Sequence, residues 1–516
     1  MKALKIIAAA GVLFTLGVVL FYFITAAPAN YNEQMYLAAS VLFMKYRLYR
    51  DFAYLQTPLL PMIYGAFFKL TGTTWYLLAG RCFTLFFSLA SGVFAFLILL
   101  RFSRDFLLAL LTGILLCLND VLMVSMQECS NYLMPVAMSL AAFYFFGVGL
   151  DKEKPGRFQI LLAGVLAALA VDAKLLYGPL AAAFVLTGLV RPVSMPIAER
   201  FKKIVLPFLI GFALGLTPIV YYALADFKQF RFDNFTYHFL VAGIKNATPE
   251  WQRASLAEKF GYAASLFPKY PANSVMMVLL LAVLATFATQ GKLRKSQSSA
   301  GFVLAVLSAI IMTILLFIPT PMWIQYFAMP VPFLVLLAGF SLAGIEGRPR
   351  SLSRPALALA TLVTIVICLP KLAGISRLLT DFPSLQAVRI HHNAVLMRQS
   401  ICPARPGDKV ATVFPAYVLD SGMDTYREFA TGLFLWELSR MVSLDREELV
   451  FNADLAKLFA NDPPRAILVS NTWSDPEFGK YAFRNGFHQA RKDFDGFLFL
   501  TRTPDSGGED LQGCEH

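Results

Sequence analysis

The first candidates for chemistry are two carboxylates in the polar segment 27–75, which separates the first two long apolar runs of the chain. Glu33 lies near the start of this segment, and Asp51 precedes a pair of prolines. A carboxylate shielded from bulk water has a raised pKa, which suits proton abstraction by a general base. Glu33 is therefore a candidate base or metal ligand, and Asp51 a candidate second acid. The alternatives are an acid at a helix N-terminus, favoured by the helix dipole, and a residue that orders a solvated turn.

A second group of carboxylates lies in one short loop, where Asp120 and Glu128 accompany Asn131 and no cation is present. Hard divalent cations take several oxygen ligands, so Glu128 is a candidate catalytic acid and a candidate metal ligand. His238, in a later polar segment, is the other candidate metal ligand, because histidine can bind a metal or carry a proton. No tight metal-binding spacing joins these residues. A divalent cation is therefore a hypothesis, beside structural roles for both side chains.

Two cations stand at the edges of apolar runs. Lys174, two residues after Asp172, interrupts the apolar stretch from about 160 to 190, a costly position that is often functional. Arg81 stands at the start of the second apolar run, and arginine suits two-point contact with phosphate. Gln325 and Tyr326 lie among prolines and could face a cavity. The alternatives are a snorkelling lysine, an interfacial arginine anchor and an aromatic belt.

The elements that must position these residues are membrane spans. The chain has 516 residues, of which 57% are hydrophobic and 15% charged, and its mean hydropathy is +0.61. A soluble globular protein is nearer a quarter charged, and several apolar runs here reach the roughly 20 residues that cross a bilayer. The net charge of +12 does not indicate a nucleic-acid partner, because the cations cluster in short loops beside apolar runs. The composition therefore predicts a polytopic α-helical membrane protein.

The hydropathy pattern predicts about eleven transmembrane helices, and the first apolar run is too long for a signal peptide. The predicted spans are approximately 6–26, 76–100, 106–122, 132–150, 158–172, 176–190, 204–225, 273–290, 300–318, 326–345 and 355–371. Among the short loops, every second one contains cations, namely Lys2, Lys5, Arg101, Arg104, Lys152, Lys154, Arg157, Arg191, Arg200, Lys202, Lys203, Lys292, Arg294, Lys295, Arg348, Arg350 and Arg354, and the other short loops have almost none. By the positive-inside rule these loops are cytoplasmic. An odd number of spans then places the C-terminal part of the chain outside.

Three long segments are therefore predicted to be extracytoplasmic: 27–75, 226–271 and 372–516. Apolar residues at helical spacing (Leu37, Val41, Met44 and Leu48) predict an interfacial helix in the first segment, and 62–70 and 252–266 are two further candidates. The last segment alternates strand-like and helix-like stretches, which indicates a small α/β domain. We thus predict a membrane module over 1–371 and an outer domain over 372–516. No GxGxxG motif or P-loop is present in the outer domain, so we expect no nucleotide.

All the unusual polar residues fall, by this topology, at the extracytoplasmic edge of the membrane. A channel or carrier would place some of them at mid-membrane or on both sides. A site confined to one edge suits a substrate with a lipid tail in the bilayer and a polar head at the surface.

The order of these residues resembles that in GT-C glycosyltransferases, above all bacterial members related to protein O-mannosyltransferases and the lipid A aminoarabinose transferase. The resemblance covers about residues 20–345 and consists of Tyr31-Asn32-Glu33 through Pro58, then Gly72, Arg81, the loop ending at Asn131, the segment from Gly164 to Lys174, and Gln325-Tyr326-Phe327. It implies a GT-C fold with interfacial helices in the first outer loop. A C-terminal outer α/β domain is a common addition in this superfamily.

The resemblance implies an inverting hexosyl- or pentosyltransferase of the bacterial inner membrane, with its active site outside the cytoplasm. The donor would be a sugar on a polyprenyl phosphate, and the acceptor an envelope glycolipid, lipopolysaccharide, polysaccharide or protein. Relatives usually carry Asp-Glu where this chain has Asn32-Glu33, so the role of base would fall to Glu33. The acid of the second outer loop matches Glu128 or Asp120, and Lys174 would contact the lipid phosphate. Arg81, Gln325 and Tyr326 complete the predicted donor site.

Two other functions share parts of this pattern. A carrier or flippase for lipid-linked glycans is disfavoured by the odd span count, the one-sided loops and the lack of an inverted repeat. A polymerase or ligase of lipid-linked polysaccharide shares the donor chemistry, but usually has its main outer loop late in the chain.

Overall fold

The computed structural model describes residues 2–150, 155–244, 255–290, 299–344, 348–401, 407–442, 451, 454–471, 476–494 and 496–502. They form two compact units. The helical unit contains Met1–Ile24, Cys82–Tyr221 and Val241–Ile375, and the mixed unit contains Thr25–Arg81, Tyr222–Leu240 and Ser376–His516. The predicted cytoplasmic cations at positions 152, 154, 292, 294 and 295 lie outside the described residues.

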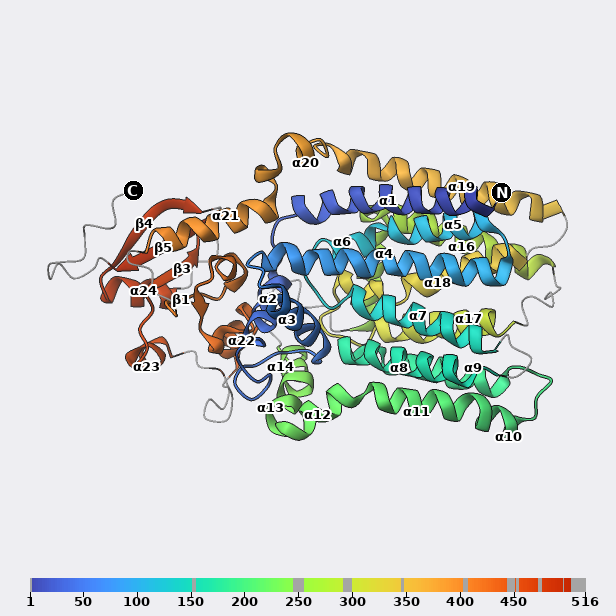
Figure 1. Ribbon diagram of the computed structural model, residues 1–516, viewed down its shortest axis with the longest axis horizontal. Coiled ribbons are helices and arrows are strands. Elements are labelled where there is room, and N and C mark those ends of the chain that lie inside the picture. The colour runs from blue at the N-terminus through green and yellow to red at the C-terminus, as the bar shows by residue number, and fades with distance from the viewer. Residues whose placement is uncertain are drawn as a thin grey trace. The chain divides into compact units, whose positions relative to one another are not determined.

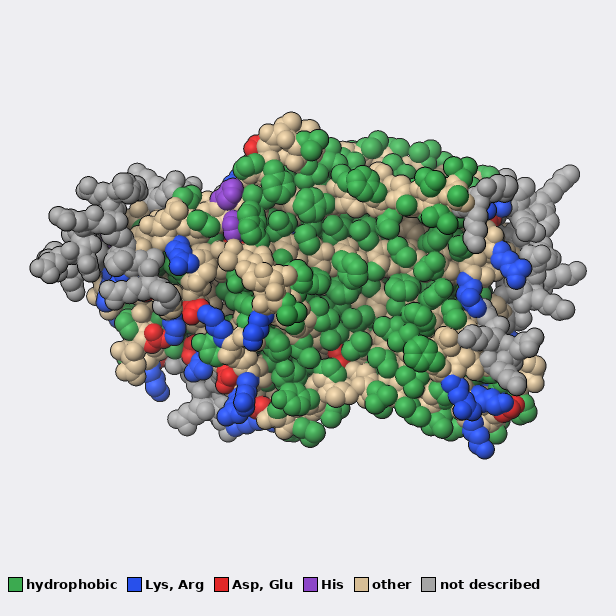
Figure 2. All heavy atoms as spheres, viewed as in Figure 1, with side chains coloured by type: hydrophobic (Ala, Val, Ile, Leu, Met, Phe, Trp, Pro, Cys, Tyr) green, Lys and Arg blue, Asp and Glu red, His purple; other side chains and the backbone are tan. Residues whose placement is uncertain are grey.

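The helical unit consists of apolar helices that run side by side (Figure 1). They are α1 (Lys2–Ala26), α4 (Tyr76–Ser103), α5 (Phe106–Cys117), α6 (Asp120–Met126), α7 (Leu133–Leu150), α8 (Arg157–Ala173), α9 (Leu180–Val190), α10 (Ile197–Arg200), α11 (Leu206–Gly215), α12 (Thr217–Ala225), α15 (Leu256–Lys269), α16 (Pro271–Gln290), α17 (Ala300–Leu316), α18 (Val331–Gly344) and α19 (Arg348–Cys368). Apolar side chains cover this unit, and Lys and Arg gather at the end that carries α10 (Figure 2). Such helices are expected of a polytopic membrane protein.

Each predicted span coincides with one of these helices or with a bent pair of them. Among the described residues, five helices are long and apolar enough to cross a membrane, or eight if each bent pair is one span. The full set of eleven spans therefore stays a prediction. The predicted spans 106–122 and 204–225 each contain a bend, since α5 and α6 meet at 55° and α10–α11 and α12 at 43°. A third bend, of 106°, joins α15 to α16.

Glycines allow the closest approach between helices of this unit. A Cβ atom on Gly211 of α11 would lie 2.0 Å from the Leu161 carbonyl oxygen of α8. A Cβ atom on Gly113 of α5 would lie 2.9 Å from the Gly92 carbonyl oxygen of α4. Membrane helices lack a hydrophobic driving force between them and pack through such small residues.

The mixed unit combines short helices with one sheet. Its helices are α2 (Tyr31–Leu42), α3 (Leu59–Thr71), α13 (Phe227–Arg231), α14 (Tyr237–Ala242), α20 (Arg377–Thr380), α21 (Gln386–Gln399), α22 (Leu433–Met441), α23 (Leu455–Ala460) and α24 (Pro476–Arg484). The strands are β1 (Lys409–Ala411), β2 (Asp424–Thr425), β3 (Ala466–Ser470), β4 (Phe487–Phe494) and β5 (Phe497–Arg502).

The five-stranded sheet has the order β2-β1-β3-β5-β4. Strand β1 pairs parallel to β2 and β3, whereas β3, β5 and β4 pair antiparallel. Leu468 of β3 lies opposite Phe499 of β5, and both belong to a buried cluster with Val410 and Met397. This core anchors the C-terminal part of the mixed unit.

The first outer segment differs from its predicted form. Helix α2 ends at Leu42, so Met44 and Leu48 do not continue it as their spacing predicted. Most of α2 is buried, Glu33 and Gln34 included, because α3 and the turn at 415–417 pack against it. Its polar side chains are therefore hydrogen-bonded within the protein rather than facing water. Helix α3 overlaps the predicted helix 62–70, and Pro61 is tolerated because it lies in the first turn.

Candidate functional site

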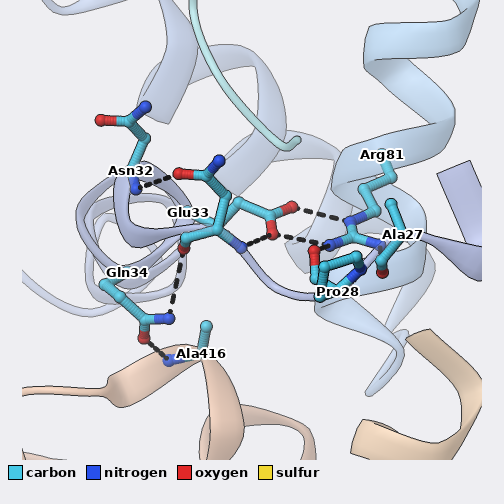
Figure 3. Close-up of polar contacts among 8 residues, drawn as sticks. Ala27, Pro28, Asn32, Glu33, Gln34, Arg81 and Ala416 are labelled. Atoms are coloured by element: carbon cyan, nitrogen blue, oxygen red, sulfur yellow. Dashed lines mark hydrogen bonds and ion pairs between the residues drawn. The ribbon is translucent and has the colours of Figure 1, made fainter. Parts of the chain in front are cut away.

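Glu33 and Arg81 form a fully buried ion pair within the mixed unit (Figure 3). Arg81 Nε donates to Glu33 Oε1 and Arg81 Nη2 to Glu33 Oε2, each at 2.7 Å. Arg81 also donates to the Ala27 and Pro28 carbonyl oxygens, both at 2.8 Å. Two-point guanidinium–carboxylate contacts of this kind combine strength with fixed geometry. The pair therefore fastens the start of α2 to the start of α4.

Glu33 also takes part in the cap of α2. Its Oε2 accepts a hydrogen bond of 2.8 Å from the Asn30 backbone, and the Asn30 side chain accepts one of 3.1 Å from the Asn32 backbone. This reciprocal arrangement is a capping box, which satisfies backbone donors at a helix start. The Asn32 amide points away from the Glu33 carboxylate (Figure 3). Glu33 thus has the role of an acid at a helix N-terminus, which was one of the alternatives from the sequence. It also has an arginine partner that the sequence did not reveal.

Further side chains of α2 contact the C-terminal part of the same unit. The Tyr31 hydroxyl donates to Glu437 Oε2 at 2.6 Å, and Gln34 Oε1 accepts from the Ala416 backbone at 2.9 Å. Burial raises the pKa of Glu437, and the Tyr31 hydrogen bond opposes this rise. Sequence analysis missed both contacts because more than 380 residues separate the partners, which are 406 and 382 positions apart.

Asp51 and His238 each contact the backbone, Asp51 within its own turn and His238 at a segment 183 positions away. Asp51 Oδ2 accepts from the Arg47 backbone at 2.8 Å, so the carboxylate orders its own turn. His238 Nε2 lies 3.3 Å from the Leu55 carbonyl oxygen. Across the described ranges, no three or more His, Cys, Asp or Glu side chains group together as a metal centre would require. Glu128 and His238 therefore stay untested as metal ligands, and the divalent cation stays a hypothesis.

Two buried aspartates that sequence analysis did not single out organise the mixed unit. Asp233 accepts from the Tyr54 backbone at 2.9 Å and from Gln229 Nε2 at 2.7 Å, and burial raises its pKa to about 7. Asp420 accepts from the Tyr76 backbone at 2.9 Å and lies 3.1 Å from His391 Nδ1. Burial raises the pKa of Asp420, while His391 opposes the rise. Both carboxylates connect segments that are distant in sequence.

Lys174 is the centre of a second cluster, which lies in the helical unit. Its backbone is extended at the end of α8, and its side chain is only 3% exposed. Its Nζ lies 3.4 Å from Asn131 Oδ1, 4.0 Å from the centre of the Tyr132 ring and 5.4 Å from that of Tyr326. Asn131 is held in turn, because its Nδ2 donates to the Ala173 carbonyl oxygen at 2.7 Å. Two predicted site residues, Lys174 and Tyr326, are thus brought together with Asn131 of the second outer loop.

The charge of Lys174 is poorly compensated. Burial lowers its pKa to about 7, and the nearby carboxylate of Glu128, itself buried, opposes this shift. An ammonium group has three donors, yet the described residues offer it one long hydrogen bond and two aromatic rings. Gln325, next to Tyr326, has a buried Oε1 with no hydrogen-bond partner in the described part of the chain. An anionic group can therefore bind at Lys174, whereas Gln325 Oε1 can accept a hydrogen bond from a donor group.

The two acids of the second outer loop have different roles. Asp120 accepts from the Ala272 and Asn273 backbones at 3.0 and 2.9 Å, so it caps the start of α16. Glu128 is the one whose charge acts on Lys174. Between these two candidates for the second-loop acid, the geometry favours Glu128 as the residue near the cationic cluster.

Comparison with known proteins gives structural neighbours only. No protein-family model matches the sequence, and no curated protein matches it. ArnT from Cupriavidus metallidurans, solved bound to undecaprenyl phosphate, has 13% sequence identity and a TM-score of 0.61, covering 98% of this chain and 99% of that one. The same protein in the apo state has 13% identity and a TM-score of 0.58, covering 96% and 100%.

A more distant neighbour is the archaeal oligosaccharyltransferase AglB from Archaeoglobus fulgidus, solved with an inhibitory peptide and a dolichol-phosphate. It has 11% identity and a TM-score of 0.50, covering 96% of this chain and 74% of that one. ArnT and AglB both have the GT-C fold. The GT-C fold implied by the sequence resemblance is therefore confirmed.

Proposed function

We propose that this protein is an inverting glycosyltransferase that moves a sugar from a polyprenyl phosphate to an envelope acceptor at the outer face of the bacterial inner membrane. The observation that supports this most is a GT-C fold shared along nearly its whole length with ArnT, a protein solved bound to undecaprenyl phosphate. The cationic cluster at Lys174, buried and short of hydrogen-bond acceptors, adds a place suited to a phosphate.

The donor phosphate binds Lys174 in this proposal. The phosphate oxygens provide the acceptors that its ammonium lacks, and Gln325 and Tyr326 border the same group. During transfer the bond between the anomeric carbon and the phosphate oxygen breaks, and the lipid phosphate leaves with the electron pair. A fixed positive charge beside the leaving oxygen stabilises the negative charge that develops there. Lys174 therefore lowers the barrier as well as holding the donor.

The acceptor hydroxyl attacks the anomeric carbon from the face opposite the phosphate and transfers its proton to a carboxylate. Glu33 and Asp51 are the two acids of segment 27–75, and Asp51 is engaged in its own turn. Glu33 is the base in this proposal, which requires that it exchange one of its contacts with Arg81 for the acceptor hydroxyl. Glu128, near Lys174, is the second acid.

The test is transfer of a labelled sugar from polyprenyl-phosphate donors in membrane vesicles that contain the full chain. Lys174→Ala should reduce transfer about 100-fold or more, and Lys174→Arg should restore part of it. Glu33→Gln should abolish transfer by removing the base. Lys259→Ala is the matched control, because Lys259 is also a buried lysine but donates to the Phe317, Ile318 and Thr320 oxygens at 2.9–3.2 Å.

Lys259→Ala should reduce stability but leave the rate per folded molecule unchanged. Undiminished transfer by both Lys174→Ala and Glu33→Gln would contradict the assigned residues. Transport of an intact lipid-linked glycan, with no new glycosidic bond, would contradict the transferase and favour a carrier.

A further inference from the structure

An apolar groove lies between α1 and the pair formed by α4 and α5, and all its lining residues belong to the helical unit. Its volume is about 520 Å³, and its walls include Leu13, Leu89, Phe96 and Leu110. Only 17% of the apolar stretch of α1 is buried, against 72% for α7, so α1 packs loosely on its neighbours. The groove is part of the surface that would face lipid.

An apolar groove at a membrane surface does not stay empty. Its walls offer almost no partner for water, and apolar cavities of this kind stay dry. Atoms that line a void also lose their dispersion contacts on that side. A hydrocarbon chain from the bilayer restores those contacts without a desolvation cost, so the groove fits a lipid chain.

One end of the groove has two cations with no acidic partner among the described residues. Lys5 and Arg104 both line it. Lys5 Nζ lies 5.6 Å from the centre of the Phe106 ring, and within the described residues neither side chain makes an ion pair. Asp105, the acid beside Arg104 in sequence, is bound by Arg354 at 2.7 Å and caps α5. The two positive charges are therefore available to an anion at the groove's end.

We propose that the groove binds an anionic phospholipid of the cytoplasmic leaflet, with an acyl chain between α1 and α4–α5 and the phosphate at Lys5 and Arg104. Basic pockets between membrane helices on the cytoplasmic side bind anionic headgroups in this way. The leaflet follows from the positive-inside rule, which places both cations in cytoplasmic loops. The donor lipid is not the occupant, because its phosphate is assigned to Lys174 at the opposite membrane edge. The inference rests on the membrane orientation of the chain that the proposed function assumes.

The experiment is native mass spectrometry of the full chain, purified in mild detergent, with phosphatidylglycerol and phosphatidylcholine of matched acyl chains. We expect one phosphatidylglycerol to be retained in preference to phosphatidylcholine. The Lys5→Gln/Arg104→Gln variant should lose this preference, by about fivefold for each cation. The control is Arg157→Gln/Lys202→Gln, which removes two exposed cations of the same predicted side away from the groove and should keep the preference.

A second variant tests the groove without changing charge. Ala10 lines the groove, and Ala10→Phe should fill part of it and reduce retention of both lipids. Equal retention of the two lipids, or a preference untouched by Lys5→Gln/Arg104→Gln, would overturn the proposal. So would stronger displacement of phosphatidylglycerol by undecaprenyl phosphate than by excess phosphatidylglycerol, since the groove would then belong to the donor. The readout needs no transfer, so it can fail or succeed independently of the transferase assignment.

Discussion

Two buried cations predicted to bind the donor phosphate have opposite surroundings. Arg81 is 0% exposed, and its guanidinium donates to both oxygens of Glu33 and to two backbone carbonyls. Lys174 is 3% exposed, yet the described residues give it one long hydrogen bond and two aromatic rings. A cation whose hydrogen-bond donors are all satisfied stabilises the structure. A cation with unsatisfied donors is suited to binding an anion. The surroundings of the two cations therefore distinguish a structural role from a phosphate-binding role, which the residue types arginine and lysine alone do not.

The largest effect should come from breaking the satisfied pair. Arg81→Met leaves the Glu33 carboxylate buried without compensation, so the free energy of unfolding should fall by about 3–5 kcal/mol. The Glu33→Gln/Arg81→Met double variant should recover part of this loss, because no uncompensated charge remains. Denaturant unfolding of the detergent-solubilised chain measures both. Equal stability of Arg81→Met and the parent would show that the pair does not hold α2 and α4 together.

The buried aspartate of the same unit should produce a pH dependence. The folded pKa of Asp233, about 7, is above its ordinary value of 3.8, so the stability it contributes is complete below about pH 4 and is lost as the pH rises through 7. Asp233→Asn cannot ionise and should remove this decline, which is on the order of 4 kcal/mol. The Gln229 amide can turn to match the new group. Unfolding curves from pH 4 to 8 test this, and an unchanged slope would contradict it.

A smaller effect is expected at the contact between α2 and α22. Tyr31→Phe removes the hydroxyl that donates to Glu437 and should reduce stability by about 1.5 kcal/mol. The ring itself is kept, and with it the edge contact to Phe434, whose ring centre is 4.8 Å away. Tyr46→Phe is a control, since the same hydroxyl is removed from another tyrosine of the first outer segment. A loss as large in the control would show that the Glu437 contact is not the cause.

The smallest stability effect should occur at the unsatisfied cation. Lys174→Met keeps the length of the side chain and removes a charge that the described residues compensate poorly, so the free energy of unfolding should stay within about 1 kcal/mol of the parent. Thermal unfolding without donor lipid measures this. A loss as large as that of Arg81→Met would show that Lys174 is a structural residue, and the contrast between the two cations would disappear.

The sequence was informative where the signal is local. Hydropathy placed a helix at every predicted span. Lys174 was recognised because an ionisable group that interrupts an apolar run is costly, and Tyr326 because it lies among prolines at the start of a span. The length of α2 was wrong, because helical spacing continued to Leu48 whereas the chain turns after Leu42.

The pairings between distant residues could not be predicted. Glu33 and Arg81 are 48 positions apart, and Tyr54 and Asp233 are 179 apart. The spacing of apolar residues along these segments does not indicate which side chains will come into contact, because the contacts depend on how the helices pack. The role of Asp120 could not be predicted either. The sequence does not distinguish an acid that caps the start of α16 from one that lies beside Glu128 in a site.

The central claim is that the unsatisfied Lys174, rather than the whole set of outer cations, holds the donor phosphate. Its most direct test is the affinity of the purified full chain for undecaprenyl phosphate, measured for the parent, Lys174→Met and Lys259→Met at one ionic strength. We predict that Lys174→Met weakens binding at least 30-fold, about 2 kcal/mol, while Lys259→Met leaves it unchanged. Unchanged affinity in a folded Lys174→Met protein would contradict the account.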